Sequence, residues 1–311
     1  MPRAPSGPRP GRSRWLGRAL VAGIAALCAL PSGAAAAEIR VVDDDGKAIV
    51  LRQPAQRIIS LAPHVTELLF AAGAGGALAG ASRYSDYPPA ALAVPRIGDS
   101  FALDAERILA LMPDLVIVWL HGNPEGQLDQ LRRLGLPVFS SEPRRLADIS
   151  ATIRRFGVLA GTESAAEAAA AAFDRRVAAL RARYAGRPAV PVFYQISERP
   201  LLTINHRHII DDVLRLCGGA NVFAGLGALT PMVSPEAVLA ANPEAIVTSA
   251  GEAGNETGFA LWSKLPSLLA TQRGNFVMLH SDTISRQSDR ILDGGAALCE
   301  QLEQVRARRR P

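Results

Sequence analysis

The sequence predicts an α/β protein made of two similar lobes that are joined by one long α-helix. Three observations support this prediction. One pattern occurs twice, as LDAERILALMPDLVIV at 103–118 and as VSPEAVLAANPEAIVT at 233–248. An alanine-rich run, 163–185, lies between the two copies. The chain has 311 residues, of which 49% are hydrophobic, and this is enough for two lobes with buried cores.

Both copies of the repeated pattern combine a capped helix, a break and a buried strand. A helix-capping side chain, Asp104 or Ser234, comes first, and an acid follows two residues later, Glu106 or Glu236. A proline then ends the helix, and a β-branched run follows it. Chance similarity between two ordinary α/β units is the alternative, but all these features keep the same offsets. We therefore predict two lobes of similar, Rossmann-like build.

The first half of the chain alternates apolar runs with helical segments. It opens with a hairpin over 39–55, whose turn is the DDDG run at 43–46. The predicted strands are 57–61, 78–82, 115–118 and 138–140, and the predicted helices outside the repeat are 63–72, 124–134 and 148–160. Because ligands bind at the carboxyl ends of strands in open α/β sheets, we expect a site in the loops after these strands.

The alanine-rich run predicts a helix that Thr162 caps and Gly186 ends. At 1.5 Å per residue it would be roughly 35 Å long, the width of a small domain. A surface helix within one domain is the alternative, and the repeat favours a connector between two lobes. The predicted domains are a signal peptide (1–37), an N-terminal lobe (38–161), a connecting helix (162–187) and a C-terminal lobe (188–311).

The second half follows the same alternation. After a strand at 190–194 and a helix at 207–217 come the second copy of the repeat, a strand at 275–279 and a last helix from about 288 to 308. The loop 280–286, which follows the last strand, therefore also lies at a carboxyl end.

The N-terminal segment has the composition of a secretory signal. Residues 1–37 hold five arginines and no acid, followed by an apolar run and by small residues that end at Ala37. The apolar run is too short for a convincing membrane span. Cys28 suggests a lipoprotein, but Leu27 precedes it where such signals have a small residue. We expect cleavage after Ala37 and a soluble exported protein.

Cleavage changes the charge and the cysteine count. Losing the five arginines would bring the formal net charge of +5 to about zero, so the composition does not favour nucleic-acid binding. Two cysteines remain, Cys217 and Cys299. In an oxidising compartment such a pair suggests a disulfide, and two buried free thiols are the alternative.

The sequence offers little support for an enzyme. It contains no nucleophile elbow, P-loop, dinucleotide fingerprint or HExxH motif. Metal ligands would have to come from His206 and His208 together with His64, His121, His280 and Asp282. Nothing in their spacing forms a cluster, so we expect neither a metal site nor a cofactor.

Aromatic and polar side chains collect at the predicted strand ends instead. Tyr84 and Tyr87 lie on a proline-braced loop after one strand, and Trp119 ends another. Asp282 and Arg286 follow the last strand. Aromatic faces bury apolar ligand surface, while a few polar groups orient the ligand. The alternatives are a core position for Trp119 and a local surface ion pair for Asp282 with Arg286.

Nearly all of residues 56–304 resemble the periplasmic cobalamin-binding proteins of vitamin B12 ABC importers. The motifs that carry the resemblance are TELLFAAG (66–73), SRYSDYPP (82–89), LDAERILALMPDLVIVW (103–119), GNPEGQLDQLRRLGLPV (122–138), LRLCGGANVF (214–223), VSPEAVLAANPEAIV (233–247) and SDTISRQSDRI (281–291). The repeat and the GG-x-N-x-F motif are shared with iron-siderophore and haem binders. The YSDYPP loop and the W-x-x-GN segment are more particular to the cobalamin members.

The resemblance implies the helical-backbone type of substrate-binding protein, with the ligand held edge-on in a cleft and little hinge motion. Tyr84 and Trp119 match aromatics that pack on the corrinoid. Asp282 and Arg286 match a pair on the other wall. The predicted ligand-binding set also contains Tyr87, Phe101 and His64, and His64 is the candidate for contact with cobalt.

The resemblance also implies a disulfide and a docking surface. Cys217 and Cys299 match the disulfide pair of the family. Glu106 and Glu236 match lobe-tip carboxylates that dock against arginines of the permease. Their place in the first turn of a helix, where a carboxylate favours the helix dipole, is a structural explanation that is compatible with docking.

The sequence departs from the family at three aromatic positions on the rim of the cleft. Ser100, Thr230 and Leu202 stand where family members have aromatic side chains. These changes imply weaker affinity or a different corrinoid, such as a cobinamide. Haem-binding relatives have a tyrosine iron ligand just after the glycine that matches Gly98, and here that residue is Asp99.

We therefore expect a monomer that captures a corrinoid as its transported ligand and delivers it to an ABC permease. Haem or ferric-siderophore binding is the alternative within the same fold. An exported metal-dependent enzyme is the alternative from another class. We expect no nucleic-acid partner and no stable membrane insertion.

Overall fold

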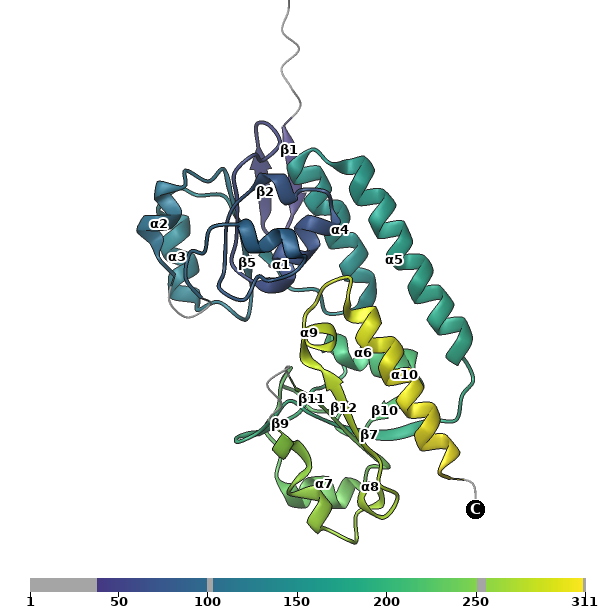
Figure 1. The fold of residues 1–311 in the computed structure, drawn as a ribbon. Helices are drawn as coiled ribbons and strands as arrows, with labels where there is room; N and C mark the ends of the chain where they lie inside the picture. Colours follow the sequence, from purple (N-terminus) through teal and green to yellow (C-terminus); the bar gives the residue numbers. More distant parts are fainter. Residues whose placement is uncertain (1–37, 100–102, 251–255, 310–311) are drawn as a thin grey trace, which may run out of the picture. The chain divides into compact units, whose positions relative to one another are not determined.

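Two four-stranded parallel sheets form the framework of the chain (Figure 1). The computed structural model describes residues 38–99, 103–250 and 256–309, all within one unit that runs from Ala37 to Pro311. The predicted signal peptide and Phe101 lie outside these residues. No helix in the described ranges is long and apolar enough to span a membrane.

The first sheet has the strand order β4-β3-β5-β6. Its strands are β3 (Ile58–Ser60), β4 (Leu78–Ala81), β5 (Leu115–Trp119) and β6 (Val138–Ser141). The accompanying helices are α1 (Pro63–Ala71), η1 (Gly75–Ala77), η2 (Pro89–Ala93), α2 (Ala105–Ala110), α3 (Glu125–Arg133) and α4 (Leu146–Ala160). β5 reads as a continuous apolar run, as expected for a central parallel strand that is covered on both faces.

The predicted N-terminal hairpin is also present. β1 (Ile39–Val42) and β2 (Ala48–Leu51) pair antiparallel. Asp43 forms the turn, since its Oδ1 accepts hydrogen bonds from the amides of Asp45 (3.0 Å) and Lys47 (2.7 Å).

The second sheet has the order β10-β7-β11-β12. Its strands are β7 (Val190–Gln195), β10 (Gly219–Asn221), β11 (Ala245–Ala250) and β12 (Phe276–His280), and a small ribbon pairs β8 (Ser197–Glu198) with β9 (Leu201–Leu202). The accompanying helices are α6 (Ile209–Leu216), α7 (Pro235–Ala241), η3 (Glu256–Phe259), η4 (Trp262–Lys264), α8 (Leu269–Gln272), α9 (Ser281–Ile284) and α10 (Ile291–Ala307). The predicted pair of α/β lobes is therefore confirmed.

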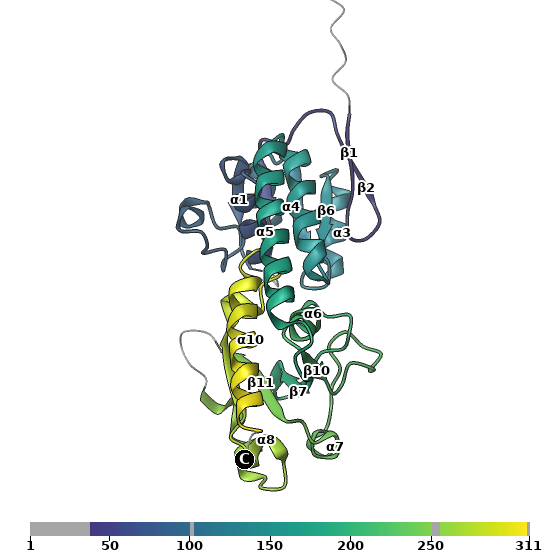
Figure 2. The same cartoon turned by 90° about the vertical axis from the view of Figure 1, so that its right-hand side faces the viewer.

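The predicted long helix is α5 (Glu163–Tyr184), which packs along α4 (Figures 1 and 2). Its buried side includes Ala166, Ala170 and Phe173. Thr162 occupies the N-cap position, but the predicted side-chain cap is wrong. Its hydroxyl instead donates to the carbonyl of Ala72 (2.7 Å), because the tertiary structure brings the end of α1 close to it.

The repeated pattern has the predicted local structure in both copies. The Asp104 carboxylate accepts from the amide of Arg107, and the Ser234 hydroxyl accepts from the amide of Ala237. These bonds cap α2 and α7, and each helix is followed by a central strand of its sheet, β5 or β11. The match in position supports two lobes of similar build.

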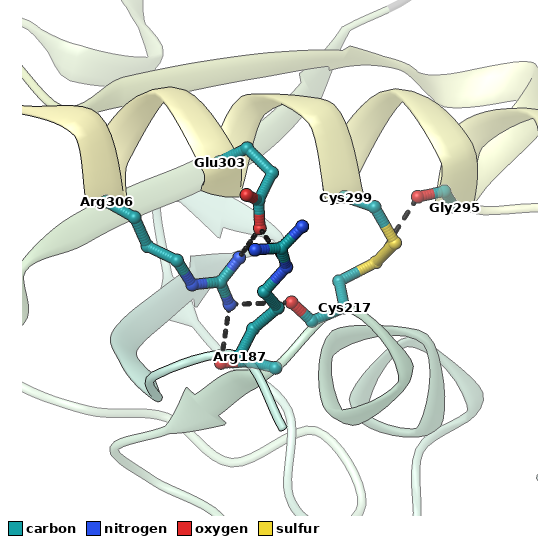
Figure 3. The surroundings of a disulfide bond; sticks show 7 residues. Arg187, Cys217, Gly295, Cys299, Glu303 and Arg306 are labelled. Carbon is teal, nitrogen blue, oxygen red and sulfur yellow. Dashed lines mark hydrogen bonds and ion pairs between the residues drawn. A yellow bond between two sulfur atoms is a disulfide. The ribbon is translucent and has the colours of Figure 1, made fainter. Parts of the chain in front are cut away.

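A disulfide joins Cys217, directly after α6, to Cys299 in α10, and both side chains are fully buried (Figure 3). This finding excludes two free thiols. Next to the disulfide, Arg306 Nη2 donates to the carbonyls of Cys217 (2.8 Å) and Gly218 (3.1 Å). The end of α6 is thus fixed to α10 by one covalent bond and two hydrogen bonds.

Candidate ligand-binding site

The predicted site residues lie just beyond the carboxyl ends of β4, β5 and β12. The loop 82–89 follows β4, Trp119 ends β5, and α9 follows β12. In the two sheets β4 and β12 are edge strands and β5 is central.

A buried group of hydroxyls holds the loop that carries the two tyrosines. Thr66 Oγ1 lies 2.7 Å from Ser60 Oγ and donates to Ser85 Oγ (2.9 Å), which in turn lies 3.0 Å from Ser82 Oγ. The Arg96 guanidinium donates to the Ser85 carbonyl (2.8 Å). The loop is therefore anchored from inside by its small polar residues.

Although the loop is anchored in this way, its two aromatic side chains are exposed to solvent. Tyr84 is 62% exposed and Tyr87 is 41% exposed. Arg290 lies over the Tyr87 ring, 3.8 Å from its centroid, in a cation–π contact. Exposed aromatic rings with fixed backbones are suited to bind a flat apolar ligand.

A tight turn after β5 fixes Trp119. Its amide donates to Asn123 Oδ1 (2.8 Å), and its carbonyl accepts from the amides of Gly122 (3.2 Å) and Asn123 (3.0 Å). A Cβ at Gly122 would lie 1.9 Å from a ring carbon of Trp119, so only glycine allows the indole to lie against this turn. Trp119 is half-buried and packs against the core, so both a core role and a ligand contact are compatible with its position.

His64 lies behind Trp119 rather than at the surface. Its ring meets the indole edge-to-face at 5.6 Å between centroids, and only 3% of the residue is exposed. Burial lowers the pKa of His64 to about 3, so the imidazole stays neutral at physiological pH. In this conformation His64 has little surface for a ligand, and a contact with cobalt stays a prediction.

Two buried nitrogens at this place lack partners. His64 Nε2 and Trp119 Nε1 make no hydrogen bond to any residue that the structure describes. Buried polar groups are normally satisfied by protein or water, so this spot is suited to hold an ordered water or a polar ligand atom.

The predicted pair of Asp282 and Arg286 is present, but Arg286 has further partners. Its guanidinium lies 3.0 Å from Asp282, 2.6 Å from Asp86 and 2.8 Å from Glu67. Arg286 is only 13% exposed, whereas Asp86 and Asp282 are 49% and 39% exposed. The outer carboxylates are therefore the more accessible members of the group.

Glu67 and Arg290 are functional candidates that the sequence analysis missed. The buried Glu67 carboxylate accepts from Arg286, from Arg290 Nε (3.1 Å) and from Ser288 Oγ (2.5 Å). This cluster ties α1 of the first lobe to the segment between α9 and α10 of the second. A signal was present: an acid inside the apolar run TELLFAAG requires buried partners.

The cluster shifts the pKa values of its members. Partial burial opposes ionisation of Asp86, but the hydrogen bond and charge of Arg286 outweigh it, so the pKa of Asp86 is lowered. Burial, and next the charge of Glu67, raise the pKa of Asp289. Burial favours the neutral form of Arg286, yet Asp86 and Glu67 raise its pKa, so the guanidinium remains charged.

The two predicted docking carboxylates occupy equivalent places in the two lobes. Glu106 lies in the first turn of α2 and Glu236 in the first turn of α7, and both are exposed. A hydrogen bond from Ser234 lowers the pKa of Glu236, so this side chain is ionised at neutral pH.

Among the residues that the structure describes, no three His, Cys, Asp or Glu side chains come together as a metal site. His206 and His208 have different surroundings. His206 is exposed, and its Nδ1 lies 2.8 Å from the carbonyl of Ala224. His208 Nδ1 accepts from the amide of Ile210 and caps α6.

Comparisons with known proteins agree with the fold. A family model for periplasmic binding proteins matches residues 58–283. A vitamin B12-binding protein of Vibrio cholerae is 38% identical over 250 residues, which cover 80% of this chain and 90% of the relative. A vitamin B12-binding protein of Yersinia pestis is 37% identical over 253 residues, which cover 81% of this chain and 88% of the relative.

Solved structures give the same result. The vitamin B12 binding protein BtuF of Vibrio cholerae superposes with a TM-score of 0.74 at 37% identity, covering 81% of this chain and 98% of that one. The haem-binding protein RhuT of Roseiflexus sp. RS-1 superposes with a TM-score of 0.68 at 27% identity, covering 81% of this chain and 99% of that one. The chain belongs to the periplasmic binding protein family.

Proposed function

We propose that this protein captures cobalamin or a related corrinoid in the periplasm and delivers it to an ABC importer. The observation that carries the proposal is the loop 82–89, which exposes Tyr84 and Tyr87 and whose Asp86 is ion-paired with Arg286 of the other lobe. Relatives named as vitamin B12-binding proteins support the choice of ligand. Since these relatives are binding proteins, capture rather than catalysis is the role that we propose.

In the proposed binding mode, aromatic side chains pack on the ligand and polar groups form hydrogen bonds with it. Tyr84, Tyr87 and Trp119 would pack on the corrin ring, with Phe101 as a further aromatic contact. The peripheral amides of a corrinoid would bond to the Asp282 carboxylate and to any N–H of Arg286 that its three carboxylate partners leave available.

Delivery would use the two exposed carboxylates of the repeat. Glu106 and Glu236 each lie in the first turn of a capped helix, one in each lobe. Two equivalent acids suit a permease with two-fold symmetry and an arginine at each docking position.

We further propose the predicted division of the chain. Residues 1–37 would direct export and be removed, and the mature chain would act as a monomer. The lobes 38–161 and 188–311 would be joined by the helix 162–187, which would limit hinge motion. The Glu67 cluster supports restricted motion, because it joins the two lobes and would have to break or rearrange in a wide opening.

Haem is the second candidate, because haem-binding structures of 27–28% identity share the fold. Asp99 occupies the place where the sequence comparison expects the iron-binding tyrosine of haem binders. An aspartate is a poor replacement for a phenolate as a haem ligand, and this favours the corrinoid.

Titration calorimetry of residues 38–311 tests the proposal, with cyanocobalamin, cobinamide and hemin measured side by side. We expect one-to-one binding of a corrinoid and much weaker binding of hemin. Hemin binding without corrinoid binding would overturn the proposal in favour of haem, and binding of neither would point to a siderophore. The ratio of the two corrinoid affinities would report the effect of the three missing rim aromatics.

A further inference from the structure

A positively charged cavity lies apart from the aromatic site. Its volume is about 370 Å³, and it is lined by Arg144, Arg145, Asp148, His206, Arg207 and Arg215. The lining thus contains four arginines and one aspartate. Such an excess of one charge in a concave place attracts an oppositely charged ligand.

The cavity is built from both halves of the chain. Arg144 and Arg145 follow β6, which is the edge strand opposite β4, and Arg207 precedes α6. The two segments meet directly, since the amide of Leu146 donates to Asp212 Oδ2 (2.9 Å). The cavity therefore lies near β6, at one edge of the first sheet, whereas the loop 82–89 with its two tyrosines follows β4 at the opposite edge.

The carboxylates around the cavity already have partners. Asp148 Oδ2 accepts from the amides of Arg144 (3.0 Å) and Arg145 (2.9 Å). Asp211 and Asp212 both form ion pairs with Arg215 at 3.1 Å. These acids neutralise Arg215 and stabilise the start of α4.

Three of the arginines at the cavity have no ion-pair partner among the described residues. Within the described ranges, Arg144, Arg145 and Arg207 form no ion pair. The Arg207 guanidinium donates to the carbonyl of Gly227 (2.5 Å), which is neutral. Like charges that are held together at one cavity repel each other, and a bound anion would relieve this repulsion.

We propose that this cavity binds a phosphate group. A guanidinium is planar and bonds to two phosphate oxygens at once, and several of them together match the oxygens of one phosphate. His206 also lines the cavity. The phosphate could be a free anion, or the phosphodiester in the nucleotide loop of cobalamin; the second source rests on the proposed function.

The first arm of the test uses inorganic phosphate at constant ionic strength, followed by ³¹P NMR or calorimetry. The variant is R145Q with R207Q, which removes two exposed charges without touching the core. The control is R175Q, because Arg175 is an exposed arginine of α5 outside the cavity. We expect saturable binding in wild type and control, and a loss of at least about tenfold in affinity in the double variant.

The second arm compares cyanocobalamin with cobinamide, which lacks the phosphodiester. If the phosphodiester occupies the cavity, the double variant should lose about tenfold in affinity for cobalamin and keep its affinity for cobinamide. Arginine-dependent binding in either arm supports the proposal and identifies the source. The proposal is overturned if the double substitution changes neither phosphate binding nor the preference between the two corrinoids.

The two proposals fail in different ways. If the aromatic site does not bind corrinoids, wild type, control and double variant all lack binding in the second arm. The first arm still decides the phosphate site in that case, because it contains no corrinoid.

Discussion

At the residue scale, the position of Trp119 depends on a glycine three residues later. The indole lies so close to Gly122 that any side chain there would overlap the ring. The W-x-x-GN segment therefore has a steric reason as well as a family resemblance: glycine allows the ring to pack down, and Asn123 holds the turn. The conformation of Trp119, a candidate ligand contact, thus depends on Gly122 and Asn123.

Gly122→Ala should displace the Trp119 ring, because the new Cβ would lie 1.9 Å from it. We expect a weaker corrinoid affinity, by about tenfold, and a change in tryptophan emission. Residues 38–311 contain two tryptophans, Trp119 and the fully buried Trp262, so the change in a protein of this length is assignable. Gly126→Ala is the control, since nothing lies within 4 Å of its Cβ position in α3. An unchanged affinity and emission spectrum would show that Trp119 does not need this packing.

His64 should make the protein less stable as the pH falls. Burial lowers its pKa in the folded state to about 3, from 6.5 in the unfolded chain. Between these two pH values the unfolded state binds a proton at His64 that the folded state does not bind. The unfolding free energy is therefore unaffected by His64 above pH 6.5 and decreases as the pH falls below it. The loss from His64 should reach about 2 kcal/mol at pH 5.

His64→Phe removes this proton, and urea unfolding at pH 7 and pH 5 measures the effect. The decrease in unfolding free energy should be about 2 kcal/mol smaller in the variant than in wild type. His208, whose pKa burial lowers to about 4, contributes to the decrease in both proteins and cancels in the comparison. Equal decreases would mean that His64 is protonated without unfolding.

At the element scale, the repeat gives the two lobes matching helices with matching exposed acids. The caps by Asp104 and Ser234 fix where α2 and α7 begin, so each following acid falls in the first turn. A carboxylate there is favoured by the helix dipole, whatever else it does. Only a functional experiment separates this structural role from docking.

Glu106→Lys combined with Glu236→Lys should abolish transport and leave corrinoid binding intact. Both side chains are exposed, so the fold should tolerate the change, while two lysines would repel the arginines of the permease. Uptake of labelled cobalamin in reconstituted vesicles measures transport, and calorimetry measures binding. Glu125→Lys is the matched control, because Glu125 is an exposed first-turn acid of α3 outside the repeat. Normal uptake by the double variant would refute the docking assignment.

At the scale of the whole molecule, the Glu67 cluster joins residues more than 200 positions apart. The Glu67 carboxylate accepts hydrogen bonds from two arginines and a serine, and all four side chains are largely buried. The arrangement is a buried ionic network: loss of Glu67 would remove the carboxylate partner of Arg290 and the most buried of the three partners of Arg286. The cluster is therefore expected to hold the two halves of the chain together.

Glu67→Gln should lower the unfolding free energy by about 3 kcal/mol, because two buried arginines lose their shared counter-charge. Denaturant unfolding measures the loss. Glu167→Gln is the comparison: Glu167 also bonds to an arginine, Arg154, but on the surface, so its loss should change stability little. If both variants are equally stable, the Glu67 cluster does not carry the stability that its burial implies.

Local sequence determined the elements of this protein. Caps, prolines and buried apolar runs predicted most strands and helices to within a few residues, because these signals act over one turn or one strand. The predicted loop 280–286 instead contains the short helix α9, and the short strands β8, β9 and β10 were not predicted. The repeat predicted two lobes, and the aromatic residues at strand ends predicted the loops of the site. The two cysteines that remain after the predicted cleavage suggested a disulfide, and the structure decided between this bond and two free thiols.

The tertiary structure decided which side chains meet. No local pattern predicted that Arg286 would contact Asp86 and Glu67. None predicted that His64 would lie buried against Trp119, or that Thr162 would bond to Ala72 instead of capping its helix. These contacts join positions far apart in the chain, and their geometry depends on how whole elements pack. A local pattern contains the propensity of a segment, whereas the partners of a buried charge are set only when the chain has folded.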